Sequence, residues 1–507
     1  MPRSPQVKKR KRASEKVVEI QTRENCAIYI PSSNSGDSSS ESGSESEGCS
    51  SDILKIPNVS YRQVLDNYEE NQSKLEPHHT YTWIEGEKKR KEEFKNECLL
   101  SDSTKTYLRS LSSVQLFELF FSFDLKRYIL ESTECNGYSF TANQLDVFLG
   151  IVLTSIFSER KSERDYWSSN ELLKCIPIAS AMSRDAFLEI KRNIKLYKPK
   201  DKNDNDKAWK VRNILDIFKK NAAQFGFSST ALSIDEMMVK FHGRAPILQF
   251  MPNKPVRFGL KMWAICNVDG YLFDCDIYCG KGTNIYSTSN EMKLSKCAVG
   301  SRVVMLMVQK ILTSVSLRKI NMYHIYFDNY FSSPDLFVHL KNIGLVATGT
   351  VRHDRVKVKN ILPKKAERGA YIVQHEENSG MNFITFMDSK PVSFLSTATG
   401  VTPLHKIRRF SVQNRSKVDL LVPKIVKQYN DFMGGVDQHD AHCSNLFPTI
   451  RRRNWTWSVL LRLIQSSITN ATVLRNLVHA NKVGTKQIAL EIAECYLAKY
   501  KLKNIHV

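Results

Sequence analysis

The chain has 507 residues, 42% hydrophobic and 25% charged, and its 74 Lys and Arg residues outnumber its 52 Asp and Glu residues to give a net charge of +22. This excess favours a polyanionic partner, nucleic acid above all. No apolar run approaches the roughly 20 residues of a membrane span, which excludes an integral membrane protein. No apolar segment of a secretory signal follows the basic N-terminus, and the 11 cysteines show no disulfide framework, so a secreted mini-protein is excluded. The cysteines also lack paired zinc spacing, which excludes a zinc finger.

Residues 1–99 are predicted to be a mostly disordered tail. Residues 32–51 contain 11 serines interleaved with acidic residues, and this composition buries too little apolar surface to offset the chain entropy. Ahead of it lies a basic run that is typical of a nuclear localisation signal or a phosphate-binding arm. The run consists of Lys8, Lys9, Arg10, Lys11 and Arg12. We therefore expect a nuclear protein that acts close to nucleic acid.

Residues 100–229 are predicted to form a helical domain. The stretch 111–125 is rich in Leu and Phe, and the apolar residues of 144–157, 182–197 and 211–225 recur at the three- and four-residue spacings of amphipathic helices. The lysine- and aspartate-rich stretch 199–209 is expected to be a loop.

The residue pattern changes over 230–351, where it predicts a mixed α/β sheet that begins with an antiparallel meander. The expected elements are strands at 231–241, 258–268 and 271–278, a helix at 299–314, a strand at 323–331, a helix ending at 342 and a strand at 345–351. Residues 352–412 are basic and partly strand-like, at 370–374, 382–388 and 392–397, and residues from 423 onward are expected to be helical.

Two aspartates lie inside apolar strand segments, Asp235 in 232–239 and Asp328 in 324–331. Aspartate is a poor strand former, and a carboxylate among apolar neighbours is costly to desolvate unless it is paired or metal-bound. A metal shared between adjacent strands would explain both residues, although a single strand aspartate is more often a hydrogen-bonded turn or edge residue. Glu236 should face the opposite side of its strand and is interpreted as structural.

Asp274 and Asp276 form a rival acidic pair on one strand face. They lie close to the predicted turn Asp269-Gly270, so we expect them to be exposed to solvent.

A third acidic position follows the pair Gly434-Gly435. If a helix continues there, Asp437 and Asp440 are three residues apart and share one face. An acidic trio from two strands and a helix can hold two Mg²⁺ ions, which stabilise the attacking and leaving oxygens of a phosphodiester displacement. His439 and His442 are interpreted as surface or packing residues, because oxygen ligands suit this metal better.

Five ordered motifs then point to one family: Ser-Ile-Asp-Glu-Met (233–237), Asn-Lys-Pro-Val-Arg-Phe-Gly (253–259), Phe-Asp-Asn-Tyr-Phe-Ser-Ser (327–333), Gly-Thr-Val-Arg (349–352) and Gly-Gly-Val-Asp-Gln-His-Asp (434–440). Over roughly residues 100–480 the chain resembles the piggyBac-type transposases and their host-derived relatives. The resemblance implies an RNase H-like core with three essential aspartates, Asp235, Asp328 and Asp437, and Asp440 as a further metal-site residue. It also implies two Mg²⁺ ions, which Mn²⁺ can replace, and cleavage at inverted repeats, hairpin ends and insertion at TTAA.

The resemblance also implies a domain arrangement. The core occupies 230–351, an insertion domain 352–420 interrupts it, and the helix with the third acid lies in 421–445. A helical domain that dimerises and binds double-stranded DNA is split between 100–229 and 446–507, which predicts a homodimer. The C-terminal stretch 488–507 contains the single cysteine Cys495 and no zinc spacing, so no structural zinc is expected.

Further basic residues are candidate DNA contacts. Arg451, Arg452 and Arg453 are expected to contact phosphates, and Trp455 is expected to stack on an unpaired base, while Trp457 is assigned to the core. The alternative is that the arginines are merely solvated and both tryptophans are core. The resemblance places four more residues near DNA phosphates: Lys254, Arg257, Arg352 and Arg355.

Two functions remain open. The intact aspartates favour a metal-dependent strand-transfer enzyme. Many members of the resembled family end in a cysteine-rich zinc-binding domain, and its absence from 488–507 favours a host-adopted nuclear DNA-binding protein that keeps the fold. A stand-alone RNase H-like nuclease does not explain the large helical flanks.

Overall fold

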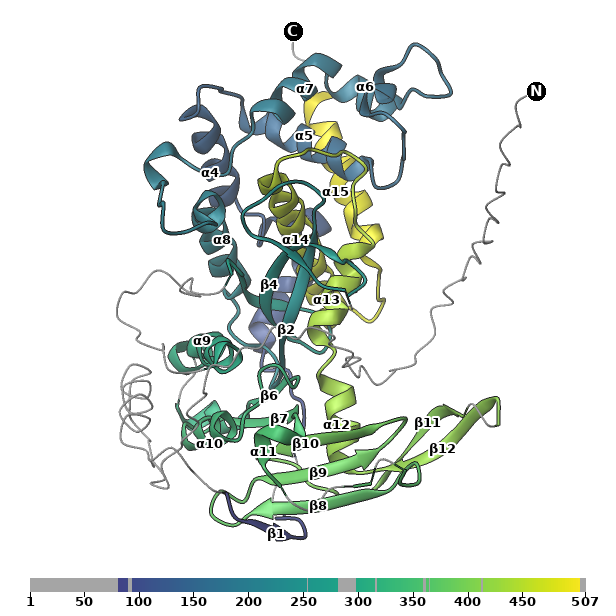
Figure 1. Ribbon diagram of the computed structural model, residues 1–507. Helices are drawn as coiled ribbons and strands as arrows, with labels where there is room; N and C mark the ends of the chain where they lie inside the picture. The colour runs from purple at the N-terminus through teal and green to yellow at the C-terminus, as the bar shows by residue number, and fades with distance from the viewer. Residues whose placement is uncertain are drawn as a thin grey trace, which may run out of the picture.

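The computed structural model describes residues 81–89, 94–252, 254–280, 298–314, 317–358, 362–363, 365–411 and 414–501. The basic run 8–12 and Asn253 lie outside these residues. Within the described ranges, none of the helices has both the length and the apolarity that a membrane crossing requires. Figure 1 shows a helical end, drawn around α5 and α15, and a sheet-rich end around β8 and β9.

A ten-stranded mixed sheet runs through the molecule in the order β1-β8-β9-β10-β7-β6-β2-β4-β3, with β5 pairing with β4. Strands β2, β4 and β5 form the antiparallel meander, and β6 lies parallel to both β2 and β7. The mixed α/β fold predicted from the sequence is therefore confirmed. Its strands are β1 (Trp83–Glu85), β2 (Ala231–Lys240), β3 (Leu248–Phe250), β4 (Phe258–Asn267), β5 (Leu272–Ile277), β6 (His324–Phe327), β7 (Val346–Thr350), β8 (Tyr371–Glu376), β9 (Asn382–Met387) and β10 (Pro391–Ser396).

Two stretches far apart in the sequence pack together as the helical end (Figure 1). Helices α5 and α15 approach so closely that a Cβ on Gly150 would lie 3.0 Å from the Cβ of Tyr496, so a larger residue there would force them apart. The helices are α2 (Asp102–Ser110), α3 (Ser113–Glu118), α4 (Phe123–Glu134), α5 (Ala142–Thr154), α6 (Ile176–Ala181), α7 (Arg184–Asn193), α8 (Trp209–Ala222), α14 (Trp455–Val478) and α15 (Thr485–Lys501), with short 3₁₀ turns at Glu163–Trp167 and Pro199–Asp201.

Further helices border the sheet. They are α9 (Val299–Ser314), α10 (Pro334–Asn342), α11 (His353–Val356), α12 (Lys424–Phe432) and α13 (Gly435–Ser444), with a 3₁₀ turn at Leu317–Met322. Ser333 caps α10 by accepting the N–H of Leu336, and Pro334 occupies the first helical position.

The segment expected as an insertion is hydrogen-bonded to the core sheet. Its strand β10 pairs with β7, and β9 and β8 continue the sheet outward. Two later strands, β11 (His405–Ser411) and β12 (Ser416–Val422), form a separate two-stranded sheet.

The end of the predicted disordered tail differs from expectation. Strand β1, at Trp83–Glu85, pairs with β8 at the edge of the sheet. Trp83 packs its ring 5.6 Å from that of Phe383, and the Glu87 carboxylate accepts the N–H of Val401. Order therefore begins before residue 99, because the partly buried Trp83 side chain and a backbone ladder compensate for a polar sequence.

Candidate active site

Asp235, in the middle of β2, and Asp328, directly after β6, lie side by side on adjacent parallel strands. Ile234 pairs with Phe327 between β2 and β6, so the two aspartates take the next position on each strand. Asp328 ends β6 four residues earlier than predicted, because its Oδ1 accepts the N–H of Tyr330 at 2.8 Å and turns the chain. The Asp328 side chain thus shapes the backbone around it.

Asp437 reaches the same place from α13. A Cβ on Gly435 would lie 2.1 Å from the carbonyl oxygen of Asn267, so only glycine lets this helix start so close to β4. Lys254 Nζ lies 3.7 Å from Asp235 Oδ2 and 3.7 Å from Asp437 Oδ1. We call Asp235, Asp328, Asp437 and Lys254 the acidic centre.

Negative charge is in excess at the acidic centre. Burial raises the pKa of Asp235 well above its ordinary value, Lys254 opposes this, and the charges of Asp328 and Asp437 add to it. Burial, with the charge of Glu236, raises the pKa of Asp328 to about 6. Burial also raises the pKa of Asp437, again against the effect of Lys254. The carboxylates repel one another, and a single ammonium group compensates them only in part.

The donor chemistry of the acidic centre fits a hard divalent cation, which prefers carboxylate oxygens. In the described part of the chain, however, no three His, Cys, Asp or Glu side chains are already arranged as a metal cluster. Lys254 instead contacts two of the three carboxylates and lies 3.4 Å from the carbonyl oxygen of Glu236. Lys254 was predicted to contact DNA, and its side chain turns inward to the acids.

Asp440, predicted as a fourth metal residue, is engaged elsewhere. Its Oδ1 pairs with Arg462 Nη1 at 2.7 Å, and its Oδ2 accepts the N–H of Met238 at 3.2 Å. Arg462 also donates to the Met238 carbonyl at 2.7 Å. Asp440 therefore ties α13 to α14 and β2. The sequence signal for this role was Arg462, a lone arginine in the apolar run 459–464, but its partner Asp440 lies 22 residues earlier.

Lys261 was missed by the sequence reasoning. Its Nζ lies 3.2 Å from Glu236 Oε2 and 4.1 and 5.0 Å from the ring centres of Trp263 and Tyr330. Because Tyr330 follows Asp328 by two residues, this contact links the loop that bears Asp328 to β4. A lysine within an otherwise apolar strand was the available signal.

Arg355, predicted to contact DNA, holds the same loop. Its Nη1 donates to the carbonyl oxygens of Asn329 and Ser332 at 3.0 and 2.8 Å, so its guanidinium is committed to the backbone. Arg257 and Arg352 are exposed, as a DNA contact requires.

The three consecutive arginines have different environments. Arg451 and Arg453 are exposed and line a half-open groove of about 550 Å³ together with Lys240, His242 and Phe447. Arg452 also lines this groove, and it donates to the carbonyls of Arg192 and Ile194, at 2.6 and 3.2 Å, at the C-terminal end of α7. Arg452 therefore closes the end of a helix, a structural role that the sequence did not predict.

Trp455 is only 8% exposed, so most of its ring is covered and little of it is open to the base on which it was predicted to stack. The apolar face of α14 turns it inward. Trp457 is 3% exposed and donates its Nε1–H to the Ile450 carbonyl at 3.3 Å, which confirms its assignment to the core. His439 is fully buried, and its Nδ1 lies 2.8 Å from the Gly270 carbonyl, as a packing residue would be.

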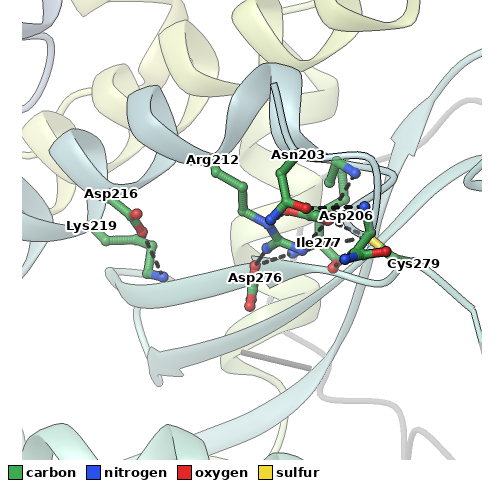
Figure 2. A network of polar contacts seen from close by, with 10 residues as sticks. Asn203, Asp206, Arg212, Asp216, Lys219, Asp276, Ile277 and Cys279 are labelled. Carbon is green, nitrogen blue, oxygen red and sulfur yellow. Dashed lines mark hydrogen bonds and ion pairs between the residues drawn. The ribbon is translucent and has the colours of Figure 1, made fainter. Parts of the chain in front are cut away.

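The rival pair Asp274 and Asp276 is buried, at 2% exposure each, and not exposed as predicted. The turn before them is followed by a strand that α8 covers. Figure 2 shows Arg212 of α8 reaching Asp276, and its Nε lies 2.7 Å from Asp206 Oδ2. We call Asp206, Arg212 and Asp276 the arginine network; it joins the helical end to the sheet.

Comparisons with known proteins agree with this geometry. Residues 112–472 match the family described as Transposase IS4. Human piggyBac transposable element-derived protein 3 is 30% identical over 335 residues, which cover 65% of this chain and 54% of that protein. Human piggyBac transposable element-derived protein 2 is 27% identical over 379 residues, or 73% and 62% of the two chains. The chain thus spans little more than half the length of these two relatives.

The fold is also similar to that of a solved structure, a cryo-EM structure of a piggyBac transposase synaptic complex with hairpin DNA. The TM-score is 0.63 at 20% identity, and the match covers 79% of this chain and 83% of the other. The RNase H-like core that the sequence resemblance implied is confirmed by this likeness. The chain belongs to the Transposase IS4 family, and it is similar to piggyBac transposable element-derived proteins and to a piggyBac transposase.

Proposed function

We propose that the protein binds double-stranded DNA and cleaves and transfers its strands with two Mg²⁺ ions, for which Mn²⁺ can substitute. Membership of the family implies transposase-type chemistry that depends on divalent metal in general. The observation that carries the proposal is the acidic centre, where two adjacent strands and a helix bring three carboxylates around one ammonium group.

Asp235, Asp328 and Asp437 would hold the metal. When bound, it supplies charge stabilisation to the attacking and leaving oxygens of the phosphodiester. Asp328 is oriented for this by the Tyr330 N–H, and its loop is held by Arg355 and Lys261. Raised pKa values of all three acids support a site whose charge awaits a cation.

Lys254 would serve as the counter-ion of the acids until metal binds. Its ammonium lies on a long flexible side chain, so it can leave Asp235 and Asp437 without a backbone change. After leaving, it would be next to the DNA phosphates. This assigns Lys254 two successive partners, the carboxylates and then the DNA.

The net charge of +22 and the groove lined by Lys240, Arg451 and Arg453 support a DNA path beside the acidic centre. Arg257 and Arg352 are further candidate phosphate contacts. We also propose the family target TTAA, a homodimer and a nuclear location directed by residues 8–12.

A second candidate is a host-adopted DNA-binding protein that keeps the fold without transposition. Two contacts favour it: Lys254 and Arg462 already neutralise part of the acidic set, at Asp235, Asp437 and Asp440.

The two candidates are separated by the variant Asp328→Asn. With Mg²⁺ or Mn²⁺ the wild-type protein should nick DNA at piggyBac-like ends, and the variant should not, because the amide keeps the shape but loses the charge. DNA affinity should be nearly the same in both. Asp431→Asn, on α12 and paired with Lys427, is the matched control and should retain cleavage. Equal inertness of wild type and variant on cognate ends supports the second candidate.

A further inference from the structure

Strands β11 and β12 form a two-stranded ribbon that is separate from the ten-stranded sheet. Figure 1 shows the ribbon projecting beyond the edge of that sheet, at the end of the molecule opposite α5 and α15. Because alternate residues of a strand face opposite sides, the ribbon has an inner and an outer face with different partners.

The inner face is anchored to the body of the protein. Ile407 and Leu420, which pair across the ribbon, pack against the apolar cluster beneath the sheet. Arg409 Nε lies 3.5 Å from Asp388 Oδ2, and Arg368 donates both to Asp388 Oδ1 at 2.8 Å and to the Phe410 carbonyl at 2.9 Å. The ribbon is therefore held in one orientation, with its outer face directed away from the core.

The outer face is exposed and mainly basic. It consists of three cross-strand pairs, Lys406 with Leu421, Arg408 with Asp419 and Phe410 with Lys417, and all six residues are exposed. The two apolar members are large and open to solvent, with Phe410 58% and Leu421 51% exposed. Asp419 is the one acid on this face, and it lies 4.0 Å from Arg408, at the limit of an ion pair.

Charge and shape together select one class of partner. Residues 405–422 contain five Lys and Arg residues and one Asp, which matches a polyanion. A two-stranded β-ribbon is one of the few elements that fit the roughly 12 Å wide major groove of duplex DNA. Seven residues per strand span about 24 Å at about 3.4 Å per residue, most of one helical turn of DNA.

We propose that the outer face of the β11–β12 ribbon docks on double-stranded DNA, away from the acidic centre. Lys406, Arg408 and Lys417 contact phosphates, and Phe410 and Leu421 lie toward the groove. The ribbon thereby gives the protein a second DNA contact in addition to the groove lined by Arg451 and Arg453. The inference rests on the proposed function in that both require the protein to bind DNA.

The test uses the full-length protein and a short duplex of mixed sequence, with affinity measured by fluorescence anisotropy at several salt concentrations. The triple variant Lys406→Thr, Arg408→Thr, Lys417→Thr keeps strand propensity and removes three charges. Its matched control, Lys200→Thr, Lys202→Thr, Lys207→Thr, removes three exposed charges from the surface between α7 and α8.

The ribbon variant should lose about tenfold in affinity at about 0.1 M salt for each phosphate contact removed, with a shallower salt dependence. The control should stay within about twofold of wild type, a smaller change than the loss of one phosphate contact. Equal losses in both variants would mean that only net charge matters and would overturn the ribbon as a docking site. Wild-type affinity in the ribbon variant would also overturn it, and would leave Phe410 and Leu421 as a protein-binding surface.

A measurement on the wild-type protein guards against misfolding of the variant. Lysine acetylation followed by mass spectrometry should show Lys406 and Lys417 protected when duplex DNA is added, and Lys200 and Lys202 unprotected. Absence of protection at the ribbon while the protein is DNA-bound contradicts the inference alone. A wild-type protein that binds no duplex contradicts the proposed function itself.

Discussion

Beside β5, the carboxylates of Asp206 and Asp276 share the guanidinium of Arg212 (Figure 2). In β2, by contrast, Asp235 lies 3.7 Å from the ammonium of Lys254 and is close to the charges of Asp328 and Asp437. In the arginine network, burial acts to raise the pKa of both acids. The hydrogen bonds and charge of Arg212 hold the pKa of Asp206 below its ordinary value, whereas burial keeps the pKa of Asp276 raised although Arg212 and Lys219 oppose it. At Asp235 burial and like charges prevail, and the pKa is raised.

We interpret this difference as one between acids whose fixed cation joins two parts of the fold and acids that are proposed to bind a metal. Buried carboxylates that join two parts of a fold carry a fixed cation, because an unpaired buried charge is costly. A carboxylate set with excess negative charge is destabilised by itself and is stabilised by whatever cation binds it. Each set contains an aspartate from an apolar strand, Asp276 in β5 and Asp235 in β2, so the neighbours supplied by the fold distinguish these two residues.

The largest effect is expected from removing the cation of the arginine network. Arg212→Met leaves Asp206 and Asp276 buried without their partner and should lower the free energy of unfolding by about 3–5 kcal/mol. Urea denaturation measures it. Arg127→Met, an exposed residue of α4 paired with Asp124, is the control and should change stability by less than about 1 kcal/mol. A small effect at Arg212 would contradict a structural role for the network.

The second prediction removes the cation of the acidic centre with the variant Lys254→Met. Removing the ammonium that contacts Asp235 and Asp437 should raise the affinity of the acidic centre for Mn²⁺ about tenfold, the effect of one neighbouring charge on a pKa. Mn²⁺ titration followed by electron paramagnetic resonance reports it without any cleavage assay. Lys240→Met, in the nearby groove, is the control. Weaker binding in Lys254→Met would mean that the lysine supports the metal site and does not compete with the cation.

Neutralising one acid in the acidic centre and one in the arginine network should change the stability of the protein in different directions. Asp235→Asn relieves repulsion and should leave stability in EDTA unchanged or raise it by about 1 kcal/mol. Asp206→Asn weakens the bonds to Arg212 and should lower stability by about 1–3 kcal/mol. Thermal unfolding of the two variants side by side measures the signs. If both variants lose stability equally, the acids of the acidic centre and those of the arginine network have the same structural role, which contradicts the comparison.

The smallest effect is a pH dependence. The pKa of Asp328 is raised in the folded protein, to about 6, from an ordinary value near 4. Between these values the folded state binds more protons than the unfolded state, so its stability falls as pH rises from about 4 to about 6. In EDTA this contribution should vanish in Asp328→Asn, and Mg²⁺ should reverse it above pH 6. If the contribution of Asp328 to stability in EDTA rises with pH, the raised pKa of Asp328 is contradicted.

Local pattern was sufficient to predict most strands of the core and to select Asp235, Asp328 and Asp437. Strand periodicity and the cost of an acid in an apolar segment are properties of a few neighbouring residues. The helix expected after Gly434-Gly435 is present as α13, but the close approach of Gly435 to Asn267 was not predicted.

The errors concern partners that lie far away in the sequence. In the sequence, Arg452 cannot be distinguished from Arg451 and Arg453. Its hydrogen-bond partner is a carbonyl at the end of α7, some 260 residues earlier. Asp276 was expected to be exposed because its turn was visible and Arg212 was not. Such pairings depend on tertiary packing, which no local pattern contains.

Cation binding by the acidic centre is tested most directly by titrating Mn²⁺ into metal-free, full-length protein and following the free ion by electron paramagnetic resonance. The wild-type protein should bind two ions with an affinity that Mg²⁺ competes for. Asp235→Asn and Asp328→Asn should each lose this binding, while Asp431→Asn retains it. Binding that is absent from the wild type, or equal in all four proteins, would contradict the assignment of Asp235, Asp328 and Asp437 as the residues that hold the metal.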